Sequence, residues 1–368
     1  IYPHRSMKLT KIIDSLEKWA PPIYQESYDN SGLLIGNKKN EIKGCLISLD
    51  CTEKVIDEAL KKGCNLIISH HPLIFEPIKS IISDSWISRT IEKAIKNNIN
   101  IYAFHTNLDN VITGVNKKIS DLIGLKNISI LSKKRGYTNK LEIYIPQKSK
   151  HTLMDKLYEI NSGTIGNYKE CSFSILGKGS FIPTSKSNPT IGKKNSKQVV
   201  EEEKIEILFH KENHDELVSI INKYHPYEEP TFFITKLENT NHEIGSGIIG
   251  KRKILFDNLL KELKKTFNKK MIKHTKPIKK NIKTIAVCGG SGSFLIDDAI
   301  NKSADVFITS DLKYHEYFKS DNKLVLIDIG HYESEQYTKD LIFEFLNKKL
   351  INIALHLSKV DTNPVKYY

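Results

Sequence analysis

The sequence has little arginine and no long hydrophobic run. Its 56 Lys and Arg residues outnumber 43 Asp and Glu residues, which gives a formal net charge of +13, yet only four are arginine: Arg5, Arg89, Arg135 and Arg252. Arginine is preferred for bidentate contacts with phosphate and guanine, whereas dispersed lysine mostly solvates a surface. The charge is therefore weak evidence for nucleic-acid binding. Because no apolar run approaches the roughly 18–20 residues that span a bilayer, we expect no integral membrane protein.

Cysteine is also scarce. The five cysteines are scattered along the chain and include no CxxC pair. A disulfide scaffold is short and rich in cysteine, so we expect reduced, mostly buried thiols and a cytoplasmic setting. The N-terminus shows no hydrophobic secretory segment. Residues 1–6 precede Met7, where a reading frame can begin, and we interpret them as a remnant outside the fold.

Predicted strands and helices alternate in the first and last thirds of the chain. Residues 44–50, 65–69 and 100–104 are buried-strand patterns separated by amphipathic helices. The pattern resumes with three strands, a long helix and a last strand at residues 284–288, 305–309, 324–329, 333–348 and 352–357. This rhythm predicts a two-halved α/β domain with a mostly parallel sheet, formed by residues 7–131 and 243–368.

The middle third, residues 132–242, follows a different pattern. Residues 141–160 and 205–224 align with matching apolar positions, and each copy is typical of a strand followed by a helix. A further strand candidate follows each copy. These repeats predict a ferredoxin-like insert in which the polar stretch 183–203 forms a loop. Outside the insert, residues 264–283 carry nine lysines, for which we expect a solvated helix face and linker.

Histidine and aspartate residues gather where the predicted strands end. Seven of them follow four different strands: His70 and His71, His105 and Asp109, Asp311 and His315, and His331. Ligands of open α/β sheets bind outside the carboxyl ends of the strands. The placement therefore predicts a functional site at this edge.

The residue types in this site favour metal binding. His331 and Glu335 are four positions apart, hence on one helical face, and the adjacent His70 and His71 can address two neighbouring ions. Imidazole and carboxylate ligands favour zinc, iron or manganese, and the lack of a cysteine ligand argues against a structural thiolate zinc site. With Asp109, these residues make five ligands, which suits two ions that share a carboxylate. The alternative is a set of unrelated buried or capping histidines.

A glycine-rich segment joins a predicted strand to a helix at the same edge. It consists of Gly289, Gly290, Ser291 and Gly292. Backbone N–H groups in such a segment can bind an anion, so we interpret these residues as candidate substrate contacts. A tight turn without a ligand is the alternative.

At these residues the sequence resembles the dinuclear-metal-centre hexamer family, the GTP cyclohydrolase I type-two homologues. The shared motifs occupy residues 19–33, 69–72 (SHHP), 105–109 (HTNLD), 309–315 and 330–335. Within the insert, residues 166–168, 171–173 and 225–229 resemble the PII-like domain of the family's longer members. One departure is Ser310, where the family motif has glycine.

The resemblance implies a ligand set and an assembly. By this similarity, two divalent ions bind to His70, His71, Asp109, His331 and Glu335. The family resemblance also implies a toroidal homohexamer, a trimer of dimers whose metal sites face the interior. It further implies an activity of the GTP cyclohydrolase type.

The leading functional hypothesis is a metal-dependent hydrolase that acts on a nucleotide or a related phosphorylated small molecule. His105, Asp311 and His315 are candidate catalytic residues, which either move protons or orient the metal ligands. One alternative is a metal-binding regulatory or chaperone-like hexamer without turnover. Others are a nucleic-acid-binding ring and a two-metal nuclease or phosphatase.

Overall fold

The computed structural model describes residues 6–350 and 352–366. The chain divides into two units, a larger one formed by residues 1–133 and 242–368 and a smaller one formed by residues 134–241. The interpretation of residues 1–6 as a remnant falls outside the described residues, except for Ser6. Within the described part of the chain, no helix combines the length and the hydrophobicity that crossing a bilayer requires.

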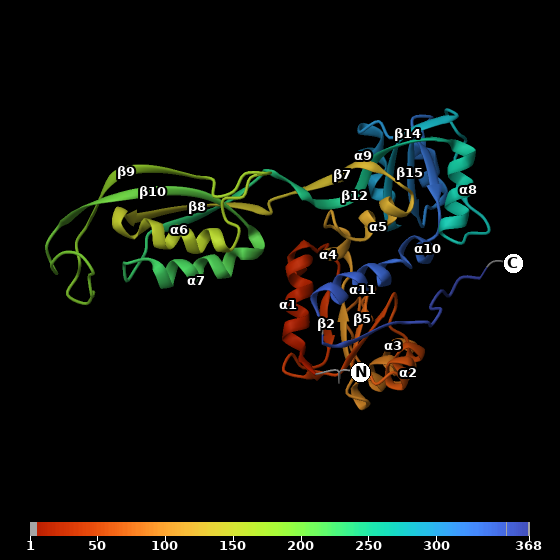
Figure 1. Cartoon of the computed structure of the whole chain (residues 1–368), viewed down its shortest axis with the longest axis horizontal. Coiled ribbons are helices and arrows are strands. Elements are labelled where there is room, and N and C mark those ends of the chain that lie inside the picture. The colour runs from red at the N-terminus through yellow and green to blue at the C-terminus, as the bar shows by residue number, and fades with distance from the viewer. Residues whose placement is uncertain (1–5, 351, 367–368) are drawn as a thin grey trace. The chain divides into compact units, whose positions relative to one another are not determined.

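The first sheet of the larger unit has five strands in the order β17-β4-β5-β6-β2, of which β2 and β5 are labelled in Figure 1. Their bounds are β2 (Gly32–Ile35), β4 (Gly44–Ser48), β5 (Leu66–Ser69), β6 (Asn100–Ala103) and β17 (Ala354–Leu357). All neighbouring strands are parallel except β2, which runs antiparallel to β6. Every residue of β4, β5 and β6 is buried, which explains why these strands are continuous apolar runs in the sequence.

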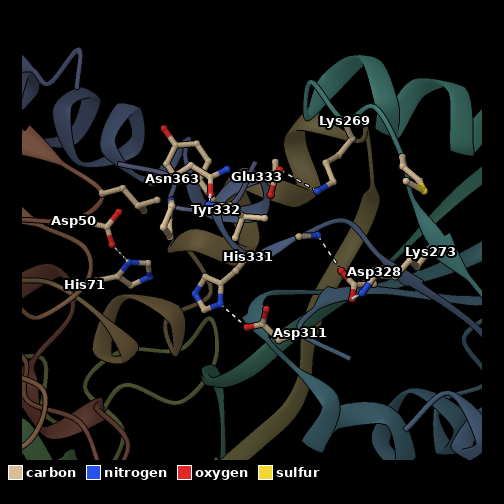
Figure 2. A pocket seen from close by; sticks show the side chains of 15 residues that line it. Asp50, His71, Lys269, Lys273, Asp311, Asp328, His331, Tyr332, Glu333 and Asn363 are labelled. Carbon is tan, nitrogen blue, oxygen red and sulfur yellow. Dashed lines mark hydrogen bonds and ion pairs between the residues drawn. The ribbon is translucent and has the colours of Figure 1, made fainter. Parts of the chain in front are cut away.

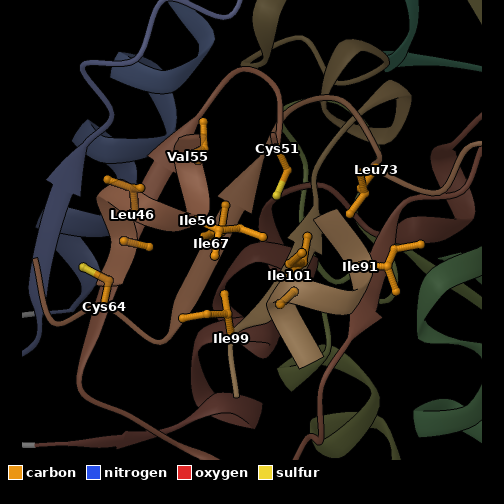
Figure 3. Packing of buried hydrophobic residues seen from close by; sticks show 12 residues of the cluster. Leu46, Cys51, Val55, Ile56, Cys64, Ile67, Leu73, Ile91, Ile99 and Ile101 are labelled. Atoms are coloured by element: carbon orange, nitrogen blue, oxygen red, sulfur yellow. The ribbon is translucent and has the colours of Figure 1, made fainter. Parts of the chain in front are cut away.

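Two helices, α2 (Glu53–Lys61) and α3 (Trp86–Lys96), contact each other and this sheet. Figure 3 shows the core between these helices and the sheet. Ile56 of α2 and Ile91 of α3 belong there to one apolar cluster with the strand residues Ile67 and Ile101. Two cysteines also lie in this cluster, and all five cysteines of the chain are free thiols. The apolar stripes of the two helices therefore cover one face of the sheet.

The second sheet of the larger unit has six strands in the order β13-β16-β15-β14-β12-β7. Their bounds are β7 (Lys126–Arg135), β12 (Thr240–Leu255), β13 (Lys273–His274), β14 (Asn281–Ser291), β15 (Val306–Ser310) and β16 (Val325–Asp328). β14, β15 and β16 are mutually parallel, whereas β12 is antiparallel to β14 and β13 is antiparallel to β16. The predicted α/β class is confirmed and the first sheet is mostly parallel, but the strands form two sheets and the second has both parallel and antiparallel pairs. The local sequence pattern could not predict the division into two sheets, because it depends on pairings such as that of β17 with β4, which lie near opposite ends of the sequence.

Helices and short strands complete the larger unit. Their bounds are β1 (Met7–Lys8), α1 (Leu9–Trp19), β3 (Glu41–Ile42), α4 (Thr106–Asp109), α5 (Val115–Leu122), α8 (Phe256–Thr266), α9 (Ile296–Asn301), α10 (His331–Glu335) and α11 (Thr338–Lys349). The single helix predicted for residues 333–348 is thus two helices, α10 and α11. α10 starts earlier than predicted because Gly330, with a φ of +85°, turns the chain directly after β16.

The smaller unit is a four-stranded antiparallel sheet with two helices. Its elements are β8 (Thr138–Pro146), α6 (Lys150–Glu159), β9 (Ser172–Phe181), β10 (Gln198–His210), α7 (His214–Tyr224) and β11 (Phe232–Leu237). The order β11-β8-β10-β9 is that of a βαββαβ, ferredoxin-like unit. Each repeat provides a strand and the helix that follows it, and the helices pack together (Figure 1). The loop predicted at 183–203 is shorter, because β10 already begins at Gln198.

Candidate metal centre

Four histidines and two carboxylates of the larger unit meet next to the carboxyl ends of its parallel strands. They are His70 and His71 after β5, His105 after β6, Asp109 at the end of α4, and His331 and Glu335 at the two ends of α10. Their ligand atoms fall into three overlapping groups of three, and within each group the atoms lie within 4.8 Å of one another. The five ligands predicted from the sequence are all among these six residues.

Glu335 lies at the centre of the cluster. Its Oε2 is 2.9 Å from Nε2 of His71 and 3.0 Å from Nε2 of His331, and its Oε1 is 3.7 Å from Nε2 of His70. Burial opposes ionisation of this carboxyl, yet the surrounding imidazoles hold the pKa of Glu335 well below its usual value. The carboxylate is therefore ionised and faces three imidazoles with its two oxygens.

Two buried polar atoms in the cluster lack a hydrogen-bond partner among the residues that the structure describes. They are Nε2 of His70 and Oδ1 of Asp109, which lie 3.7 Å apart. Burial raises the pKa of Asp109 to about 6, against the opposing effect of His70. A buried polar atom without a partner is costly, and a nitrogen and an oxygen aimed at the same space are the donor types that zinc, iron and manganese accept. The residues present thus fit a metal ion.

Each imidazole of the cluster is fixed through its other ring nitrogen. The Nδ1 atoms bond to acceptors at 2.6–2.9 Å: His70 to the carbonyl of Phe104, His71 to Asp50, His105 to Asp29 and His331 to Asp311. Figure 2 shows the pairs formed by Asp50 and Asp311. Because Nδ1–H donates to these groups, Nε2 of each ring is left as a ligand atom. Such hydrogen bonds orient metal-binding histidines and raise their basicity.

A cavity of about 500 Å³ lies beside the cluster (Figure 2). His71, His331 and Asp311 line it, together with Lys269 and Lys273. The cavity therefore gives a small molecule access to the metal-binding side chains. Its size is within the range of about 300–1,000 Å³ for small-molecule sites.

The two lysines of the cavity are paired with carboxylates. Nζ of Lys269 is 2.9 Å from Glu333, and Nζ of Lys273 is 3.0 Å from Asp328. Lys269 is only 8% exposed. The expectation that residues 264–283 form a solvated helix face and linker is wrong for this residue, because its partner Glu333 is carried by the buried helix α10.

Comparison with known proteins gives this arrangement a family. The model of the Duf34/NIF3 (NGG1p interacting factor 3) family matches residues 7–364. The chain belongs to this family. Similar proteins from Staphylococcus epidermidis and Staphylococcus aureus are 39% and 35% identical over 98% of this chain and 100% of theirs, and both are named GTP cyclohydrolase 1 type 2 homolog. The crystal structure of a Bacillus cereus protein related to NIF3 covers 98% of this chain and 99% of its own, with a TM-score of 0.84 and 31% identity.

The family resemblance inferred from the sequence motifs is thereby confirmed. In this Duf34/NIF3 chain, the glycine-rich segment forms the end of β14 and the turn after it. The N–H groups of Gly289 and Gly290 already donate to Asn116 (2.9 Å) and Ser334 (3.0 Å). A Cβ atom at Gly290 would collide with Oε1 of Glu335. Gly290 thus lets the β14 backbone approach Glu335, and the amides of both glycines are already engaged in hydrogen bonds within the chain.

Some of the other candidate residues contact the cluster and others do not. Asp311 bonds to His331, and it also accepts a hydrogen bond of 2.5 Å from the hydroxyl of Ser291. Gly292 begins the turn after β14. His315 is exposed, and its ring contacts those of Tyr314 and Phe318. The structure therefore brings Asp311 and His105 to the cluster, whereas His315 contacts neighbouring aromatic rings.

Sequence reasoning missed the two aspartates that orient His71 and His105. Asp50 comes two residues after the end of β4, so the strand-end pattern could have found it. Asp29 lies in a loop 76 residues before His105, and no spacing signals that contact. Burial raises the pKa of Asp29, but hydrogen bonds from His105 and Thr106 lower it well below its usual value. Asp29 is therefore an anion that holds His105 in place.

Proposed function

We propose that this chain is a hydrolase that binds two divalent ions and acts on a nucleotide or a related phosphorylated small molecule. The observation that carries the proposal is the pair of buried, unpartnered ligand atoms of His70 and Asp109 inside a cluster of further imidazoles and a carboxylate. The adjoining cavity supports a small-molecule substrate. The names of the Staphylococcus relatives agree with a nucleotide substrate.

The proposed ligands are His70, His71, Asp109, His331 and Glu335. Glu335 would contact both ions, because its Oε1 faces His70 while its Oε2 faces His71 and His331. Zinc, iron and manganese all accept this mixture of imidazole and carboxylate. When bound, a pair of such ions supplies Lewis acidity and lowers the pKa of water from 15.7 toward about 7.

The chain's own residues hold and move protons around this centre. Nδ1 of His105 is bonded to Asp29, so its Nε2 is the atom that exchanges a proton with substrate or water. Asp311 and His331 line the cavity and are hydrogen-bonded to each other, and Asp311 also accepts the hydroxyl of Ser291, which supports a role for Ser291 next to the substrate. Lys269 and Lys273 attract anionic groups, although each is matched by a carboxylate. The phosphate of a substrate therefore competes with Glu333 and Asp328 for these lysines.

Two further proposals come from the family resemblance. The first is a toroidal homohexamer, a trimer of dimers with interior metal sites. The second is that the ferredoxin-like unit at residues 134–241 is a PII-like module. The βαββαβ order supports the second proposal.

The function is tested by metal analysis and a substrate screen. We expect two ions per chain by elemental analysis, together with hydrolysis of GTP, another nucleotide or a phosphomonoester. Glu335→Gln should lose both metal and turnover, whereas the control Glu344→Gln, on the exposed side of α11, should retain both. Fewer than one ion per chain at saturation would contradict the dinuclear site. Two ions without turnover of any substrate would favour the non-catalytic metal-binding alternative.

A further inference from the structure

The smaller unit contains a cavity of its own, of about 550 Å³. It lies at one end of the antiparallel sheet, between the loop 182–197 and the segment 225–231 that leads into β11. Two hydrogen bonds tie the loop to the segment: the N–H of Asn188 donates to Glu228 (2.8 Å), and the hydroxyl of Thr190 donates to the carbonyl of Pro226 (2.7 Å). The cavity is therefore bounded by backbone segments that are held together.

This cavity is lined by acidic residues, although the chain as a whole is basic. Its lining includes Glu202, Glu228 and Glu229, and among the described residues that line it there is no Lys, Arg or His. The chain as a whole carries a net charge of +13. A cavity without any basic side chain in so lysine-rich a protein is unsuited to phosphates or other anions and suited to cations.

Glu202 is the buried carboxylate of the cavity. It is 9% exposed, and no ion pair with a lysine or arginine is formed by it within the described residues. A Cβ atom at Gly179 would overlap its Oε2, so glycine at that position leaves room for the carboxylate. The nearby His225 is held neutral, because its Nδ1 accepts the N–H of Tyr227 and burial lowers its pKa. Glu202 therefore has no cation of the protein's own.

Polar and aromatic groups complete the site. Burial and the neighbouring carboxylate of Glu202 raise the pKa of the buried Tyr227 hydroxyl, which therefore stays protonated beside that carboxylate. The ring of Tyr227 lies 6.0 Å from that of Phe181, and the ring of Tyr144 lies 6.4 Å from that of Phe233. All four rings line the cavity. Aromatic faces attract cations, and a buried carboxylate is stable only when it is paired or protonated.

We propose that this cavity binds a small organic cation, an ammonium or guanidinium group on an apolar body, with Glu202 as its counter-ion and the aromatic rings as its walls. The cavity volume falls within the usual range for small-molecule sites. The proposal is independent of the metal chemistry, because every residue it uses belongs to residues 134–241. A protein variant that lacks the metal ligand Glu335 should therefore bind the cation unchanged.

The test is isothermal titration calorimetry on the full chain with benzyltrimethylammonium, tryptamine and agmatine. Indole-3-propionate, which carries the indole of tryptamine but a negative charge, is the matched ligand. At least one cation should bind, and indole-3-propionate should not. Glu202→Gln should weaken cation binding by at least about thirtyfold, because a buried charge loses its partner. Glu201→Gln, an exposed neighbour on β10, should leave the affinity unchanged.

A second variant separates recognition from folding. Phe233 is 56% exposed, so Phe233→Leu should leave the thermal unfolding midpoint unchanged while weakening cation binding several-fold through loss of a ring face. The proposal is overturned if no cation binds at millimolar concentration, if indole-3-propionate binds as well as tryptamine, or if a folded Glu202→Gln variant keeps the wild-type affinity.

Discussion

The carboxylate of Glu335 lies 2.9 Å from Nε2 of His71, a residue 264 positions earlier in the chain. The same carboxylate lies 3.0 Å from His331, which is one helical turn away on α10. The second distance follows from helix geometry alone. The distance to His71 is short only because the end of β5 and α10 lie next to each other in the folded unit. Metal binding at this carboxylate therefore requires both the local helix and the packing of distant segments.

Asp50 should set the metal affinity through His71. Its Oδ1 accepts the Nδ1–H of His71 at 2.7 Å and keeps Nε2 free for a metal. Asp50→Asn removes the negative charge that makes the ring basic, so we expect the metal affinity to fall by about 10–100-fold. A competition titration with a metal-binding dye measures the affinity. Asp57→Asn is the control, since Asp57 is a partly exposed residue of α2 paired with Lys93. Equal affinities in the two variants would show that Asp50 does not orient a ligand.

Gly290 should be required for metal binding because of its closeness to Glu335. Gly290→Ala places a Cβ against Oε1 of Glu335 at a residue with a φ of +59°. Gly166→Ala is a matched control: its φ is +58°, and a Cβ there has no atom within 4 Å. Both variants should lose about 1 kcal/mol of unfolding free energy from the left-handed backbone. Elemental analysis should show that only Gly290→Ala loses metal. Full metal content in Gly290→Ala would contradict the inferred close approach.

Metal affinity should rise with pH across the neutral range. Burial alone would lower the pKa of His71, but hydrogen bonds with Asp50 and Glu335 have the larger effect and raise this pKa to about 9. At neutral pH the metal-free ring is therefore protonated, and a metal must displace that proton. The affinity should rise about tenfold per pH unit for each proton displaced. Calorimetry in two buffers of different ionisation enthalpy counts the released protons. An affinity that is flat between pH 6 and 8 would show that His71 is not a ligand.

The sequence predicted those parts of the site that depend on strand ends and on one helical turn. His70, His71 and Asp109 follow buried strands, and such strands are recognisable from their apolar runs. The pairing of Glu335 with His331 follows from their spacing. None of this required knowledge of how the strands associate.

What the sequence could not predict depends on contacts between distant segments. The division into two sheets is set by strand pairings such as β17 with β4, which no local pattern encodes. The contact of Asp29 with His105 joins a loop to a strand end. The role of Gly290 also depends on what packs against it, since a strand-to-helix turn and a close approach to Glu335 both favour glycine. These three features are thus determined by contacts between distant segments, which the local sequence pattern does not encode.

Removing one partner of the buried ion pair of Lys269 and Glu333 should destabilise the larger unit strongly. The two side chains are 5% and 10% exposed and lie 2.9 Å apart. Lys269→Met leaves the carboxylate of Glu333 buried without that partner, which typically costs about 3–5 kcal/mol of unfolding free energy. Replacing both residues, as Lys269→Met with Glu333→Leu, removes the uncompensated charge and should restore much of the loss. Lys270→Met, at an exposed position, should change the free energy by less than about 0.5 kcal/mol. Urea unfolding of the metal-free protein measures all three variants, and a Lys269→Met variant as stable as Lys270→Met would show that the pair is screened by solvent.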